Sequence, residues 1–98
     1  MIYTVPCDLI PFDKTFRLIS MEDTRFLHCN IKTLNLIPSV IAYQRCIEQG
    51  CQETVFHRGE RVTECAHSNI LIIKNGVLCT PPRDNLILPG ITLKHLLM

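Results

Sequence analysis

The amino-acid sequence predicts one domain of the α+β class, with mixed strands and one main helix. Several short apolar runs rich in Ile and Val are bounded by turn residues, which is typical of strands. One longer segment carries apolar residues at helical spacing. The chain has 98 residues, which suffice for one domain with a modest core but not for two.

The first elements are an irregular segment and a strand. Residues 1–14 are predicted to be irregular because prolines and aspartates interrupt their short apolar pieces. Residues 14–20 alternate polar and apolar side chains with partial regularity, and this pattern predicts a strand. Residues 21–25 then predict a turn that leads into the segment CNIKTLNL at positions 29–36.

The main helix is predicted between Asn35 and Gly50. Pro38 suits the first helical turn, Asn35 is a possible cap, and Gly50 is a typical helix terminator. The apolar side chains between them repeat at about 3.6 residues, the period of a helix; they are Ile37, Val40, Ile41 and Ile47.

Two hairpins are predicted after this helix. Residues 53–57 and 62–64 form the strands of the first, around a tight turn that contains a glycine. Residues 69–74 and 77–80 form the second, joined by Asn75-Gly76, the strongest short hairpin signal in the chain.

The chain ends with a loop and a short helix. Residues 81–85 predict a loop, and a turn at Pro89-Gly90 follows. Residues 92–98 predict the start of a helix with Thr92 as its cap. Because a helix of about seven residues is unstable alone, we expect this chain to be an interior piece of a longer protein.

Charge and composition argue against several partners. The net charge is +1 and the basic residues are scattered, so we expect no nucleic-acid or membrane-surface partner. The longest apolar runs fall far short of the ~20 residues of a membrane span. The N-terminus lacks the features of a signal peptide, and we expect a cytoplasmic protein. Six cysteines contain no Cys-x-x-Cys pair and no histidine at ligand spacing, so we expect no metal site and no disulfide.

Lys32 and Glu64 are the side chains with the clearest chemical potential. An amine in an apolar stretch and a carboxylate on a later strand are the two groups that pyridoxal phosphate chemistry most needs. Composition alone favours a solvated surface lysine at position 32, and an exposed glutamate at the end of a hairpin is common.

Seven segments, in order, decide between these interpretations. With them the chain resembles the class IV, pyridoxal-phosphate-dependent aminotransferases, and most closely the D-amino acid aminotransferases. Residues 1–21 match only loosely. The segments are NIKTLNL (30–36), EQGCQE (48–53), HRG (57–59), VTE (62–64), SN (68–69), KNGVL (74–78) and LPGIT (88–92).

The resemblance implies a role for five residues. Lys32 would form a Schiff base with pyridoxal 5′-phosphate and move protons at the substrate. Glu64 would pair with the pyridine nitrogen and keep it protonated. Leu88 would pack against the ring, and Ile91 and Thr92 would bind the phosphate group. The substrate-binding residues are unknown.

The resemblance also implies a fold and an activity. The fold would be a partial large (C-terminal) domain of a fold-type IV pyridoxal-phosphate enzyme. Residues 1–14 would be the remnant of an interdomain connection, and residues 15–98 an incomplete cofactor-binding domain. The whole enzyme would be a homodimer that converts D-alanine and 2-oxoglutarate into pyruvate and D-glutamate. Because other groups for the phosphate and the substrate have no matching position here, we expect the isolated chain to be inert.

Three alternatives stay open at this point. A branched-chain aminotransferase or an aminodeoxychorismate lyase would share the fold, whereas a truncated, non-catalytic remnant would fold partially or act only as an interaction module. The chain also departs from the family pattern, since many relatives have a glycine and small hydroxyl residues where Cys65, Ala66 and His67 stand. The roles of Cys65 and His67 remain open.

Overall fold

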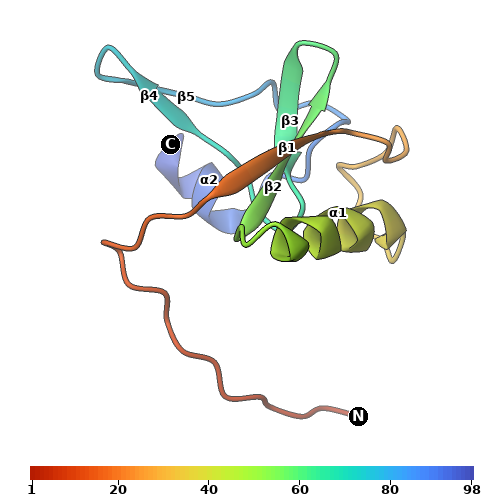
Figure 1. Cartoon of the computed structure of the whole chain (residues 1–98). Coiled ribbons are helices and arrows are strands. Elements are labelled where there is room, and N and C mark those ends of the chain that lie inside the picture. The colour runs from red at the N-terminus through yellow and green to blue at the C-terminus, as the bar shows by residue number, and fades with distance from the viewer.

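A computed structural model that describes residues 1–98 shows a small α+β fold, which confirms the predicted fold class (Figure 1). Three strands form one sheet, two form a separate hairpin, and two helices complete the fold. In chain order the elements are β1 (Leu18–Glu22), α1 (Ile37–Glu48), β2 (Glu53–Arg58), β3 (Arg61–Cys65), β4 (Ile72–Lys74), β5 (Val77–Cys79) and α2 (Ile91–Leu96).

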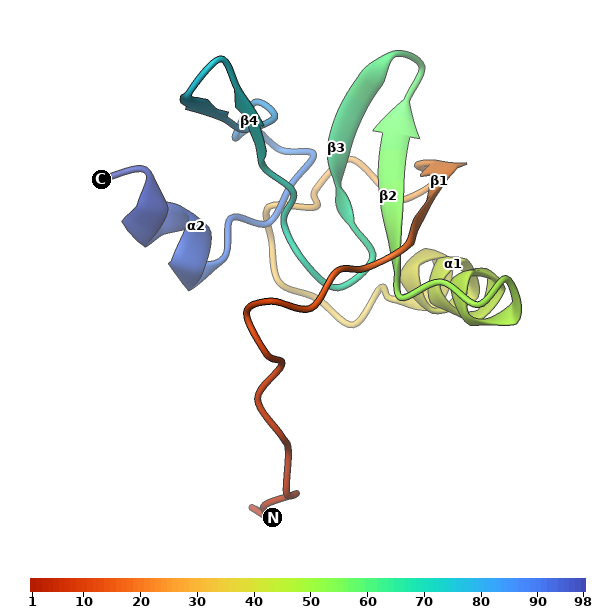
Figure 2. The same ribbon diagram turned by 60° about the vertical axis from the view of Figure 1, so that its left-hand side comes forward.

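The three-stranded sheet is mixed, with the strand order β1-β2-β3. β1 runs parallel to β2, with Leu18 opposite Glu53, and β2 runs antiparallel to β3. Parallel neighbours need a crossover, and α1 supplies it. Figure 2 shows α1 beside one end of the sheet, with the β4–β5 hairpin and α2 on the opposite side of the molecule.

Small side chains let α1 pack closely on the sheet. Its buried residues are Ser39, Ala42 and Cys46. Thr54 of β2 is fully buried, and its hydroxyl donates a hydrogen bond of 3.0 Å to the carbonyl oxygen of Ala42. A larger residue at position 42 would push the helix off the strand.

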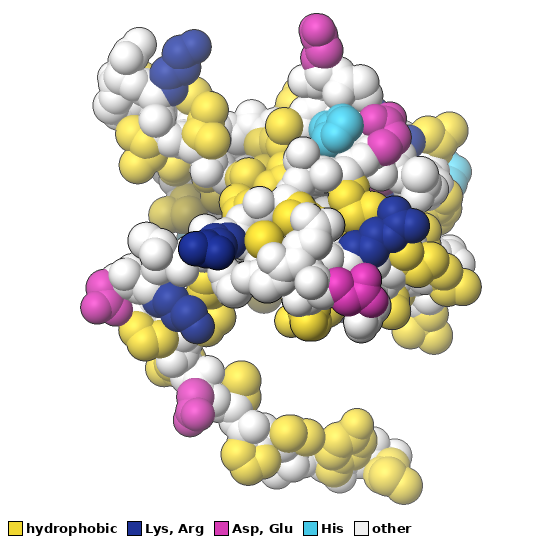
Figure 3. Space-filling model, viewed as in Figure 1, with side chains coloured by type: hydrophobic (Ala, Val, Ile, Leu, Met, Phe, Trp, Pro, Cys, Tyr) yellow, Lys and Arg dark blue, Asp and Glu magenta, His cyan; other side chains and the backbone are white.

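The predicted helix is confirmed, but its apolar stripe faces outward. Ile37, Val40, Ile41 and Ile47 are between 48% and 73% exposed. Figure 3 shows hydrophobic side chains spread over the surface around α1. Pro38 lies in the first turn as predicted. The Asn35 cap is wrong, because Leu36 occupies the cap position and no side chain caps the helix.

The β2–β3 hairpin contains a bulge that matters for the site. Val55 pairs with Cys65 and His57 pairs with Val62, so β3 has one extra residue between these pairs. A bulge breaks the alternation of side chains along a strand. As a result Thr63 and Glu64, which are consecutive, are both buried.

Some predicted boundaries were wrong. β1 begins at Leu18 and ends at Glu22, so it takes up two residues of the predicted turn, because its ladder with β2 extends to the pair Glu22 and His57. β4 begins only at Ile72, although the apolar run starts earlier. Thr92 is not the cap of α2, since Gly90 occupies that position in extended conformation.

Residues 1–17 contain no helix or strand, and the N-terminal tail extends away from the body of the molecule (Figure 1). The buried core lies at the sheet and beside α2, and its hydrophobic members include Phe56, Ile87 and Leu93. All six cysteines are free, and three of them are buried. Neither helix has the length and apolar character that a membrane crossing requires.

Candidate active site

A cavity of about 430 Å³ lies between the loop that joins β1 to α1 and the segment that follows β3. Lys32, Glu64 and Leu88 all line it, so three predicted site residues from distant parts of the sequence come together. Ile91 and Thr92 do not line the cavity, but the neighbouring Gly90 does. The beginning of α2 therefore touches the same space.

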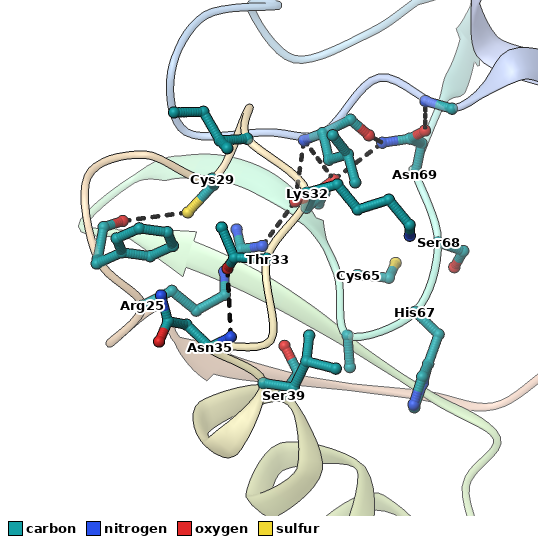
Figure 4. Close-up of a pocket in the computed structure, with 17 residues that line it drawn as sticks. Arg25, Cys29, Lys32, Thr33, Asn35, Ser39, Cys65, His67, Ser68 and Asn69 are labelled. Atoms are coloured by element: carbon teal, nitrogen blue, oxygen red, sulfur yellow. Dashed lines mark hydrogen bonds and ion pairs between the residues drawn. The ribbon is translucent and has the colours of Figure 1, made fainter.

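Lys32 lies on the β1–α1 loop and is exposed. Figure 4 shows its side chain extending across the cavity toward the segment that holds Cys65 and Ser68. The amine has no ion-pair partner among the acidic side chains, unlike Arg25 and Arg58. Lys32 therefore takes no part in the ion pairs that hold the fold together, and its side chain lines the cavity.

Glu64 is 5% exposed and its carboxylate is surrounded by donors. Nη1 of Arg25 donates to Oε1 at 2.6 Å, and Nδ2 of Asn69 donates to Oε2 at 2.9 Å. The backbone N–H of Leu88 contacts both oxygens, at 3.2 and 3.1 Å. These bonds fix the orientation of the carboxylate at the wall of the cavity.

Arg25 is a site residue that sequence reasoning missed. Besides Glu64 it binds Asp23 through two bonds of 2.9 Å, and its side chain is only 10% exposed. The guanidinium also lies 4.9 Å from the ring centre of Phe56. The signal available in the sequence was an Asp-x-Arg pattern before the lysine segment, which alone predicts nothing specific.

The charged side chains of this cluster and their burial shift one another's pKa values. Burial would raise the pKa of Asp23, but hydrogen bonds from Arg25 and Thr63 outweigh it and lower the pKa to about 2. Burial raises the pKa of Glu64, against the opposing effect of Arg25. Although burial opposes its charge, the two carboxylates hold the pKa of Arg25 above its usual range. Arg25 is therefore a permanent cation behind Glu64.

The segment after Glu64 forms a wall of the cavity and is held by Glu53. One oxygen of Glu53 accepts bonds from the backbone N–H of His67 at 3.2 Å and from the hydroxyl of Ser68 at 3.1 Å. The ring of His67 stands edge-on to Tyr43 of α1, with 4.3 Å between ring centres. In Figure 4 it points away from Lys32. His67 thus supports the wall.

Two buried thiols also line the cavity. Burial raises the pKa of Cys65 to about 11 and also raises the pKa of Cys29, whose thiol donates to the carbonyl oxygen of Phe26 at 3.1 Å. Both are neutral at physiological pH, so neither is a ready nucleophile.

Comparisons with known proteins identify the family of the chain. The family model "Amino-transferase class IV" matches residues 11–98, and the chain therefore belongs to the class IV aminotransferases. It is 55% identical to a D-alanine aminotransferase of Listeria monocytogenes over 75 residues, which are 76% of this chain and 26% of that protein. It is 47% identical to a D-alanine aminotransferase of Staphylococcus epidermidis over 74 residues, again 76% of this chain and 26% of that protein.

Solved structures show the same fold. A putative 4-amino-4-deoxychorismate lyase from Legionella pneumophila superposes with a TM-score of 0.72 at 31% identity, over 84% of this chain and 32% of that one. A fold IV transaminase from Curtobacterium pusillum superposes with a TM-score of 0.73 at 20% identity, over 84% of this chain and 31% of that one. The family and the fold-type IV architecture inferred from the seven segments are confirmed. The chain spans about a quarter of the length of the D-alanine aminotransferases that it matches.

Proposed function

We propose that this chain carries the cofactor-binding part of a D-amino acid aminotransferase that uses pyridoxal 5′-phosphate. The observation that supports this most strongly is the meeting of Lys32, Glu64 and Leu88 at one cavity. These residues are far apart in the sequence, and the resemblance assigns all three to the same cofactor.

The residues present fit such a cofactor. A carboxylate has about four lone-pair positions, and Arg25, Asn69 and the N–H of Leu88, which is shared between both oxygens, make four contacts with Glu64. The N–H of a pyridinium ring would replace one arm of the shared Leu88 contact. The cavity, at about 430 Å³, lies within the usual range of small-molecule sites, roughly 300–1,000 Å³.

Each residue then has a defined task. Bound pyridoxal phosphate supplies an aldehyde that captures amines and a ring that accepts electrons from the substrate's α-carbon. Lys32 would hold the aldehyde carbon and move a proton to and from the α-carbon. Glu64 would hold the proton on the ring nitrogen, and Arg25 would orient Glu64. Leu88 would cover one ring face and exclude water.

Further parts of the proposal follow from the family resemblance. Ile91 and Thr92, at the beginning of α2, would bind the phosphate through backbone N–H groups and the threonine hydroxyl. Residues 1–14 would belong to an interdomain connection and residues 15–98 to an incomplete domain. The whole enzyme would be a cytoplasmic homodimer. The isolated chain would be inert, since positioning and charge effects from other parts supply much of an enzyme's acceleration.

The substrate class is tested with the product of the intact gene. We expect D-alanine and 2-oxoglutarate to give pyruvate and D-glutamate, identified by chiral chromatography. The matched control is the Lys32→Ala variant, in which turnover should fall by at least ~10³-fold because the covalent anchor is gone. Turnover of L-leucine or L-valine, with D-alanine left unchanged, would reject the proposal in favour of a branched-chain aminotransferase.

The structural similarity to a Legionella protein named as a putative 4-amino-4-deoxychorismate lyase supports a second candidate. The same panel includes 4-amino-4-deoxychorismate as a substrate. Its consumption without transfer of an amino group to 2-oxoglutarate would favour the lyase. The higher identity to D-alanine aminotransferases, 55% against 31%, is why we place the transaminase first.

A further inference from the structure

Asn69 uses all the polar atoms of its side chain within the site. Its Nδ2 donates to Oε2 of Glu64 at 2.9 Å and to the carbonyl oxygen of Leu88 at 3.0 Å. Its Oδ1 accepts the backbone N–H of Gly90 at 2.8 Å. One amide group thus joins the buried carboxylate to the turn that precedes α2, as the dashed lines in Figure 4 show.

A second link closes this connection into a ring. The backbone N–H of Leu88 donates to both oxygens of Glu64, while its carbonyl oxygen accepts from Asn69. Glu64, Asn69 and Leu88 therefore each form hydrogen bonds with both of the other two. Such a closed set of hydrogen bonds resists displacement of any single member more than a chain of separate bonds would.

Gly90 allows its own backbone to approach the side chain of Asn69 closely. A Cβ atom at this position would lie 3.0 Å from Oδ1 of Asn69, which is closer than real Cβ atoms tolerate comfortably. The backbone of Gly90 is extended, with φ of −71° and ψ of 167°, so an alanine would fit the backbone itself. The glycine is needed because of the side chain of Asn69 and not because of its own conformation.

We propose that Asn69 is a positioning residue that couples the two ends of the cofactor site. It would fix the distance between the carboxylate that binds the pyridine nitrogen and the turn that leads to Ile91 and Thr92. The inference rests on the proposed function for what the two ends bind. The coupling itself is a property of the chain and has a test of its own.

The first test needs no cofactor. Amide hydrogen exchange is measured by NMR on the chain, its Asn69→Ala variant and the control Asn30→Ala, an exposed asparagine without a side-chain hydrogen bond. We expect Asn69→Ala to speed exchange at Gly90 and at Leu88 by tenfold or more relative to the amides of α1. Leu88 is decisive, because its N–H binds Glu64 and not Asn69. Faster exchange at Gly90 alone would overturn the coupling.

The second test uses the cofactor. The affinities for pyridoxal 5′-phosphate and for pyridoxal, which lacks the phosphate, are compared in the wild type, Asn69→Ala and Asn30→Ala. We expect the advantage of the phosphorylated form to fall at least tenfold in Asn69→Ala and in Gly90→Ala, with a shifted absorption band of the bound cofactor. Equal weakening of both ligands would overturn the inference. If the wild type binds neither compound, the proposed function fails, and the exchange experiment still decides the coupling.

Discussion

Replacing Arg25 by methionine perturbs the site most directly. The substitution removes the cation that lies between the carboxylates of Asp23 and Glu64, which are 6% and 5% exposed. Breaking a buried ion pair by removing one partner costs about 3–5 kcal/mol, because an uncompensated charge stays behind. We expect the free energy of unfolding at pH 7 to fall by this amount. Arg25→Lys keeps the charge but loses the forked geometry, and we expect a smaller loss of about 1–3 kcal/mol.

The assay is urea unfolding followed by far-ultraviolet circular dichroism. Arg61→Met is the matched control, since Arg61 pairs with Asp84 at 2.8 Å near the surface, and such pairs contribute about 0–1 kcal/mol. If Arg25→Met is already unfolded in buffer, Arg25→Lys carries the comparison. Equal losses in the Arg25→Lys and Arg61→Met variants would refute the reasoning that the Arg25 cluster is a buried, desolvated ion-pair network.

Other predictions concern pH, reactivity and packing. Because the pKa of Asp23 is lowered to about 2, its ionised form stabilises the fold above pH ~3.8. This contribution, about 2 kcal/mol, is lost as the pH falls toward 2. An acid titration of the free energy of unfolding should therefore lack this loss in the Asp23→Asn variant. Iodoacetamide should alkylate exposed Cys7 roughly a hundredfold faster than Cys65, whose pKa is about 11, and equal rates by peptide mass spectrometry would contradict the burial. On α1, Val40→Lys should change the free energy of unfolding by less than about 0.5 kcal/mol, whereas Ala42→Val should lower it by about 1–3 kcal/mol in the same urea assay. The reverse order would mean that the helix packs on its other face.

The sequence predicted those elements well whose ends are set by neighbouring residues in the chain. Asn75-Gly76 specified a hairpin through its positive φ angles of 50° and 76°, and Gly50, with φ of 70°, ended α1. The ends of β1 could not be predicted this way, because its length depends on pairing with β2, which lies more than thirty residues away. The sequence pattern also could not predict that the apolar stripe of α1 faces outward, since small residues rather than large ones pack on the sheet.

The sequence predicted the candidate site only in part, because some of its residues act through contacts between distant segments. Lys32 and Glu64 stand in recognisable segments, and the structure brings both to one cavity. Arg25 and Asn69 line the same cavity, and both hold Glu64 through hydrogen bonds. No periodicity or spacing marks a residue whose role is to form hydrogen bonds with other groups of the protein. The β3 bulge that buries Glu64 is likewise a feature of pairing and not of sequence pattern.

Covalent trapping tests the central claim, that Lys32 is the amine that takes up pyridoxal phosphate. The chain is mixed with the cofactor, reduced with borohydride, digested and mapped by mass spectrometry; Lys14, Lys74 and Lys94 serve as internal controls. We expect the label on Lys32 at cofactor concentrations that leave the other three unmodified, and we expect Glu64→Gln to weaken it. Equal labelling of all four lysines, or labelling that Glu64→Gln leaves unchanged, would contradict the account.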